Sequence, residues 1–305
     1  MSSVISDAHF HDERVAYAYV EARIWPNGPI CPHCGNADPS RMKLMAGKST
    51  RLGVRQCNEC RKPFTVKIGT IFEASHVPLR HWLQAIHFMT ASKKGISSNQ
   101  LHRTLAVTLK TAWFMSHRIR ESMRSGDLAP MGGPGGVVEA DETFIGRKEG
   151  SIKRRGHGHK NAVLSLVDRE SKQVRSFHVF SVSAAELVPI VKANVAKETA
   201  MMTDEWSGYY SLGHHFASHE SVSHKADEYV RGDAHTNTAE GFSIFKRGMK
   251  GVYQHCSEKH LHRYVAGFDF RYNNRIRLGC DDVERADRAL KGVSGKRLTY
   301  RTAHS

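Results

Sequence analysis

The chain has 305 residues, of which 40% are hydrophobic and 25% charged, a globular composition that argues against disorder of the whole chain. Lysine and arginine total 45 against 30 aspartates and glutamates, and the resulting net charge of +15 favours nucleic acid over an anionic membrane as the partner. Because no apolar run approaches the roughly 20 residues that span a bilayer, and residues 1–13 lack a signal peptide's apolar stretch, we expect a cytoplasmic, nucleoid-associated protein.

Four of the six cysteines lie near the N-terminus, among short, turn-broken segments of β-like composition. Cys31-Pro-His-Cys34 and Cys57-Asn-Glu-Cys60 form two Cys-x-x-Cys pairs, and four thiolates at such spacing can bind one tetrahedral Zn²⁺. Disulfides or a redox motif are the alternatives, which a cytosolic context and the duplication of the motif disfavour. We interpret His33 as a surface residue, and Cys256 and Cys280 as buried or partly buried thiols. A zinc ribbon is predicted, which can grip DNA, hold a partner or only stabilise the fold.

A helical region follows the cysteine pairs. Apolar spacing predicts one helix starting after Pro78, a short helix with serine capping near Ser98, and a longer helix over Leu109–Met123. Two helices joined by a tight turn resemble a helix-turn-helix, with Lys110 and Arg118 as candidate DNA contacts. The alternative is a helical connector with a solvated basic face.

The remainder of the chain alternates between strand-like and helical segments after a Gly/Pro linker. Three strands, of which the last two suggest antiparallel pairing, then a helix, a strand and later helices are expected, which is the order of an RNase H-like sheet. The expected elements are the strands Val137–Ile145, Ala162–Val167, Val174–Phe180 and Thr199–Thr203 and the helices Ala184–Lys197, Thr238–Arg247 and Glu258–Tyr272.

These patterns predict an α/β (α+β) fold in which a mixed RNase H-like sheet with helices follows a zinc ribbon and a helical segment. The expected parts are a ribbon (1–75), the helical segment (76–126), the linker (127–136), a catalytic domain (137–275) and a basic C-terminal tail (276–305).

Acidic residues interrupt two apolar strand candidates. Asp141 and Glu142 are adjacent in the first strand and point to opposite faces, so one of the two is expected to serve a single site. Asp204 ends a second strand candidate, and Glu240 begins a late helix. Three such carboxylates can converge on paired divalent ions about 3.5 to 4 Å apart, and hard oxygen ligands suit Mg²⁺ or Mn²⁺. A surface salt bridge remains the alternative for any one acid alone.

The sequence around these acids resembles ISXO-like insertion-sequence transposases over nearly the whole chain. That group also carries an N-terminal zinc ribbon. The motifs that carry the resemblance are Asp141–Gly146, Thr203–Tyr209, His235–Phe242, Lys246–Gly248 and Arg271–Asn273.

The resemblance implies an RNase H-like DDE domain in which Asp141, Asp204 and Glu240 bind Mg²⁺ or Mn²⁺. The implied reaction is DNA strand nicking and transfer at terminal inverted repeats, with double-stranded DNA ends and target DNA as partners. A homo-oligomer on DNA is expected because two ends must be held together. A nuclease or resolvase of the same fold, and a non-catalytic DNA-binding descendant of a transposase, are the alternatives.

Four residues are candidates for auxiliary roles. Asn237 precedes Glu240 by one helical turn and is interpreted as a cap, a neighbour of the metal site or a rival ligand. The basic residue that often follows the third acid in the group is Arg247, on the helical face of Glu240, or Lys246, rotated away. His224 is expected to orient a phosphate or a carboxylate, or to make a structural hydrogen bond.

A basic segment directly follows the first strand. We interpret Gly146–Lys160 as a loop that contacts backbone phosphates without reading sequence, although charge runs are often only solvated loops. Its candidate DNA-binding residues are Arg147, Lys148, Lys153, Arg154, Arg155 and Lys160.

Overall fold

The computed structural model describes residues 3–124, 126, 128–204, 207–222 and 244–299. The chain divides into two compact units. Unit 1 comprises Met1–Arg124 and Gly279–Ser305, and unit 2 comprises Ser125–Leu278. Within the described ranges, no helix is long and apolar enough to cross a membrane.

Unit 1 contains a small antiparallel sheet in the order β1-β2-β3. Its strands are β1 (Met42–Leu44), β2 (Arg55–Cys57) and β3 (Pro63–Phe64). The side chains of Met42, Phe64, Cys31 and Cys57 form one buried cluster. A core this small calls for a second source of stability, such as a bound metal.

Side-chain carboxylates cap the N-termini of two helices of unit 1. Asp12 caps α1 by accepting from the Arg14 and Val15 amides at 2.7 and 3.0 Å. Glu13 caps α2 from a distance, because its carboxylate accepts from the Leu79 and Arg80 amides. The helices are α1 (Glu13–Ile24), α2 (Leu79–Thr90), α3 (Ser98–Leu105), α4 (Leu109–Ser122) and α9 (Asp282–Lys291).

Two of these helices were not expected. α1 lies where the sequence suggested β-like segments, and it is helical because Asp12 caps it and Ala16 and Val20, one turn apart, are buried together on one face. α9 lies within the expected basic tail. It packs against α1, α2 and α4, and the buried Arg285 donates to the Thr90 carbonyl at 3.0 Å.

The helices α3 and α4 begin where capping residues predicted them. Ser97 accepts from the Gln100 amide and Thr108 from the Thr111 amide, both at 3.1 Å. Ala106, with φ of +52°, ends α3 in the left-handed region and starts the tight turn to α4. Two packed helices joined by a short turn are therefore confirmed.

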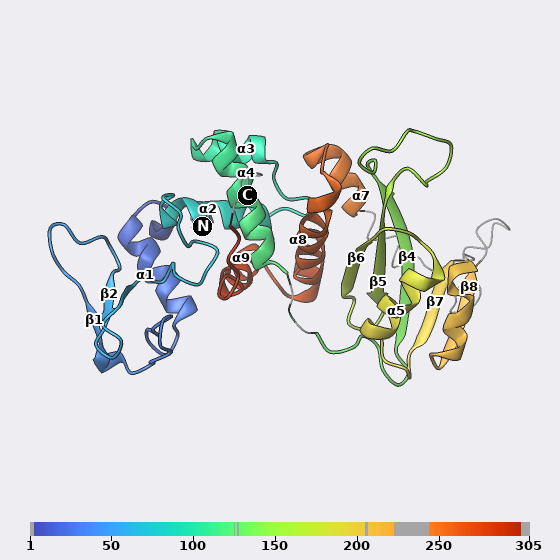
Figure 1. Ribbon diagram of the computed structural model, residues 1–305, viewed down its shortest axis with the longest axis horizontal. Coiled ribbons are helices and arrows are strands. Elements are labelled where there is room, and N and C mark those ends of the chain that lie inside the picture. The colour runs from blue at the N-terminus through green and yellow to red at the C-terminus, as the bar shows by residue number, and fades with distance from the viewer. Residues whose placement is uncertain (1–2, 125, 127, 205–206, 223–243, 300–305) are drawn as a thin grey trace. The chain divides into compact units, whose positions relative to one another are not determined.

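Unit 2 is built on a five-stranded mixed sheet in the order β6-β5-β4-β7-β8 (Figure 1). The first three strands pair antiparallel, whereas β7 is parallel to β4 and β8 to β7. The predicted chain order of three strands, a helix and a further strand is confirmed, and β8 is an additional strand that the sequence did not predict. The strands are β4 (Val137–Ile145), β5 (Asn161–Asp168), β6 (Val174–Val179), β7 (Ala200–Asp204) and β8 (Ser218–Val222).

Helices cover both faces of this sheet, which explains why all eight residues of β5 are buried. α5 (Ala184–Asn194) packs on the face that bears Val138, Ala140 and Leu164. α7 (Ile244–Gly248) and α8 (Leu261–Asn273) pack on the face that bears Val163 and Val167. Of the predicted helix over 238–247, only the part from Ile244 lies within the described residues.

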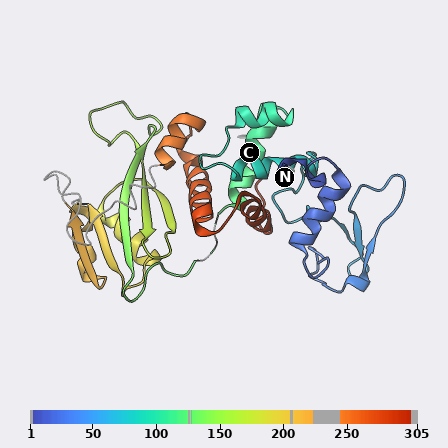
Figure 2. The same cartoon turned by 180° about the vertical axis from the view of Figure 1, so that it is seen from behind.

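The helix α8 lies beside the edge strand β6 (Figures 1 and 2). The side-chain amide of Asn273 accepts from the Val174 amide at 2.7 Å and donates to the Val174 carbonyl at 2.8 Å. The Arg-Tyr-Asn motif therefore ends in a residue that satisfies backbone groups at the sheet edge.

Candidate functional site

The four N-terminal cysteines converge in unit 1. Their sulfur atoms all lie within 4.8 Å of one another, with Cys31 3.6 Å from Cys60 and Cys34 3.7 Å from Cys57. Zn–S bonds of about 2.3 Å in a tetrahedron place sulfurs about 3.8 Å apart. The donor set and its spacing therefore fit one Zn²⁺.

Backbone hydrogen bonds prepare one of these thiols, Cys57, for a metal. The pKa of the Cys57 thiol is lowered to about 7, chiefly by a hydrogen bond from the Cys60 amide, with a further contribution from the Glu59 amide. A thiolate is the form that binds zinc. His33 is exposed, as predicted, with Nε2 3.3 Å from the Pro63 carbonyl, and Cys256 and Cys280 form no disulfide within the described structure.

Two candidate carboxylates of unit 2 lie on neighbouring strands. β4 and β7 pair in parallel with Val137 opposite Ala200 and Glu139 opposite Met202. Continuing this register by two residues brings Asp141 level with Asp204, and residues at the same level of a parallel pair share a face. Both side chains are half-buried.

A third acid of β4 has a different environment. Glu139 is fully buried, and its Oε1 accepts from Arg169 Nε at 2.6 Å. A buried carboxylate with a charged partner is explained by that ion pair. Glu139 therefore serves the fold and is not a candidate for the site.

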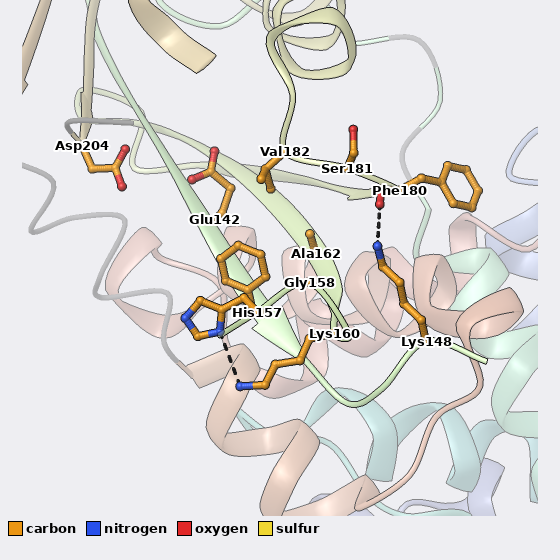
Figure 3. Close-up of a pocket in the computed structure, with 11 residues that line it drawn as sticks. Glu142, Lys148, His157, Gly158, Lys160, Ala162, Phe180, Ser181, Val182 and Asp204 are labelled. Carbon is orange, nitrogen blue, oxygen red and sulfur yellow. Dashed lines mark hydrogen bonds between the residues drawn. The ribbon is translucent and has the colours of Figure 1, made fainter. Parts of the chain in front are cut away.

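The residue that sequence reasoning set aside, Glu142, faces a cavity that Asp204 also lines (Figure 3). The hydroxyl of the buried Tyr209 donates to Glu142 Oε1. Burial, together with the negative charges of Asp204 and Asp141, raises the pKa of Glu142 to about 8. Three carboxyl groups thus share one electrostatic environment. The only sequence signal for Tyr209 was its place in the motif after Asp204.

Five further residues were candidates for catalytic or auxiliary roles. Three of them, Glu240, Asn237 and His224, lie outside the described residues. Lys246 and Arg247 are both exposed on α7.

The basic segment after β4 is a loop in the structure, between β4 and β5. Arg147, Lys153, Arg154 and Arg155 are exposed. Lys148 and Lys160 are half-buried at the cavity, where Lys148 Nζ donates to the Phe180 carbonyl at 2.7 Å. All six candidate DNA contacts of this loop therefore lie on the carboxylate-bearing unit.

The structure contradicts the prediction that Arg118, in unit 1, contacts DNA. Arg118 is only 4% exposed, and its guanidinium donates to the carbonyls of Ile71 at 2.6 Å, Glu73 at 2.8 Å and Leu298 at 3.1 Å. Such a side chain holds distant segments together and does not reach a phosphate. Lys110, by contrast, is exposed.

Two segments of the chain match models of known protein families. Residues 134–273 match the family model of the ISXO2-like transposase domain, and residues 11–63 match that of the transposase zinc-ribbon domain. The chain is 30% identical over 282 residues to an uncharacterized protein in transposable element ISH50 of Halobacterium salinarum. The match covers 86% of this chain and 91% of that protein.

A solved structure gives a weaker likeness. The matching chain comes from a simian T-cell lymphotropic virus intasome in complex with PP2A regulatory subunit B56 gamma. It is 12% identical, with 55% of this chain and 66% of that chain covered and a TM-score of 0.28. At that score the likeness supports no structural argument.

Proposed function

The chain belongs to the ISXO2-like transposase family, and we propose that it nicks DNA and transfers strands at the terminal inverted repeats of an insertion sequence, using Mg²⁺ or Mn²⁺. The observation that carries the proposal is the parallel pairing of β4 with β7, whose register, continued by two residues, brings Asp141 level with Asp204. Two carboxylates held in this way, with the chemistry of hard oxygen donors, suit a divalent metal.

Asp141, Asp204 and Glu240 are the proposed metal ligands. When bound, paired divalent ions would activate a water or a 3′-hydroxyl and would stabilise the leaving oxygen of the phosphodiester. The protein supplies the rigid sheet that fixes two of these carboxylates. Asn237, His224, Lys246 and Arg247 are proposed to act around the site, where a basic side chain would neutralise phosphate charge.

Double-stranded DNA is the proposed substrate. The net charge of +15 favours a polyanion, and the exposed arginines of the 146–160 loop lie on the same unit as the carboxylates. We propose that this loop contacts backbone phosphates, that Lys110 adds a contact in unit 1, and that a homo-oligomer holds the two DNA ends together. The zinc ribbon and the α3–α4 pair are the candidate readers of the end sequence.

The test uses the full chain with duplexes that carry the ends flanking its coding region. Asp204→Asn should lower Mg²⁺-dependent cleavage by at least about 100-fold, since it removes a ligand worth several kcal/mol in the transition state. Glu220→Gln is the matched control, because Glu220 is an exposed acid of the neighbouring strand β8. It should leave cleavage within about two-fold of the unmodified protein, a change under 0.5 kcal/mol.

Strand joining is read in the same reactions with a supercoiled target. Cleavage that depends on Asp204 without any joined product would identify a nuclease and not a transposase. Unchanged cleavage in Asp204→Asn would overturn the proposed site, and no cleavage by the unmodified chain would favour a non-catalytic DNA-binding protein.

A further inference from the structure

A cavity of about 650 Å³ lies in unit 2 beside Asp204 and Glu142 (Figure 3). Asp204 and Glu142 line one side, while Ala162 and Val182 contribute apolar surface. Its volume lies within the range of about 300 to 1,000 Å³ that is typical of ligand sites. Metal-bound carboxylates alone do not explain a cavity of this size.

An aromatic pair forms one wall of the cavity. The ring of Phe144, on β4, stacks on that of His157, from the 146–160 loop, with centroids 4.5 Å apart and planes inclined by 9°. Phe144 packs against the core under α5, whereas His157 is exposed. The loop therefore presents a planar ring, backed by a fixed ring, at the mouth of a mostly apolar cavity.

Two lysines lie at the same cavity. Lys160 Nζ is 3.5 Å from His157 Nδ1 and Lys148 Nζ is anchored on the Phe180 carbonyl, as the dashed lines in Figure 3 mark. A flat apolar surface with cations beside it is the combination that binds single-stranded nucleic acid, through base stacking and phosphate contacts.

We infer that this cavity binds an unpaired base of the DNA end, next to the phosphodiester at the carboxylates, with the base stacked on the Phe144–His157 pair. This inference rests on the proposed function. Lys148 and Lys160 contact the flanking phosphates, and the Glu142 carboxyl group accepts a hydrogen bond from an N–H group of the base. Carboxylates on one side and lysines on the other fit a nucleotide better than an apolar side chain of a protein partner, which would leave both sets of charges without a match.

The test compares labelled duplexes that carry a short thymidine overhang with the same duplexes whose overhang is abasic. Binding is measured by fluorescence anisotropy in Ca²⁺. Base stacking on aromatic side chains contributes about 1 to 3 kcal/mol per base, so the intact overhang should bind at least about five-fold more tightly. His157→Ala should reduce this ratio to about one, and His157→Phe, which restores a planar ring, should recover it.

The control variant is His214→Ala, which removes an exposed histidine of the same unit that does not line this cavity. It should keep the preference for the intact base. Equal binding of intact and abasic overhangs, or a preference that survives in His157→Ala, would overturn the inference. Asp204→Asn should retain the base preference while losing cleavage, so a failure of the proposed catalytic site and a failure of the base pocket give different results.

Discussion

Asp269 of α8 accepts two hydrogen bonds from Ser176 of the edge strand β6, from the backbone amide at 2.7 Å and from the hydroxyl at 2.8 Å. One turn further along α8, Asn273 binds Val174, two residues earlier on β6. The spacing of one helical turn thus matches the two-residue repeat of the strand edge. α8 thereby satisfies an edge that would otherwise be open to pairing with another chain.

We expect Asp269 to make the free energy of unfolding depend on pH. Burial raises its pKa to about 7, although the hydrogen bonds from Ser176 act in the opposite direction. Because the pKa in the folded chain exceeds the unfolded value, this group's contribution to stability is full below about pH 4 and is lost as pH rises through about 7. Asp269→Asn, a mimic of the protonated acid, should therefore lose less stability than the unmodified chain between about pH 5 and pH 8.

Guanidinium unfolding midpoints of the zinc-loaded full chain measure this difference. Glu170→Gln changes an exposed acid of the same unit and should leave the pH profile as it is. Parallel profiles for Asp269→Asn and the unmodified chain would show that Asp269 does not titrate in this window.

Arg118 is predicted to stabilise unit 1 and not to bind DNA. Arg118→Ala removes donors from three carbonyls and a guanidinium that lies 4.4 Å from the centre of the Phe114 ring. Hydrogen bonds from charged groups contribute about 1.5 to 3 kcal/mol each, so a loss of several kcal/mol is expected. Arg118→Lys should not rescue it, since an ammonium cannot reproduce the planar fork.

The readout is the unfolding midpoint together with DNA affinity of the protein that remains folded. Lys110→Ala, on the exposed face of the same helix, should leave the midpoint unchanged and weaken DNA binding. A stable Arg118→Ala variant with weakened DNA binding would contradict this assignment.

Arg118 shows which contacts the sequence alone does not predict. The sequence predicts the strand over Val137–Ile145 with its observed bounds, because strand composition is a local signal. Local signals also place Asp141 and Asp204 on strands. They do not report that Leu298, far along the chain, supplies a carbonyl to Arg118. The turn of the Glu142 carboxyl toward Tyr209 likewise depends on tertiary packing.

Zinc is predicted to hold the fold of the ribbon. Cys57→Ser should lower bound zinc from about one ion per chain to near zero, because a serine hydroxyl is not a thiolate ligand. The short strands of the ribbon then lose their main constraint, and limited proteolysis should cut within residues 25–68. Cys256→Ser, which changes a thiol outside the cluster, should keep both zinc and protease resistance. Full zinc content in Cys57→Ser would contradict the four-cysteine site.

Asp141 and Glu142 are predicted to differ in their effect on metal dependence. Asp141→Asn should abolish cleavage, since it removes a ligand on the face shared with Asp204. Glu142→Gln replaces a carboxyl group whose pKa, raised to about 8, keeps it mostly neutral at about pH 7. The Mg²⁺ concentration at half-maximal rate should therefore stay within about two-fold, and the maximal rate within about ten-fold, about 1.4 kcal/mol. Mg²⁺ titrations of cleavage measure both variants. The reverse pattern would make Glu142 the ligand.

The 146–160 loop is predicted to set the salt dependence of DNA binding. Each phosphate contact contributes about 0.9 to the slope of log affinity against log salt concentration. Replacing Lys153, Arg154 and Arg155 with alanine should therefore lower the slope by about two to three, with equal effects on end DNA and unrelated duplex. A triple alanine variant at Lys172, Lys192 and Lys197, which are exposed on the same unit, removes the same charge. If that control lowers the slope equally, net charge and not loop contact governs binding, because a charge effect without contact does not depend on position.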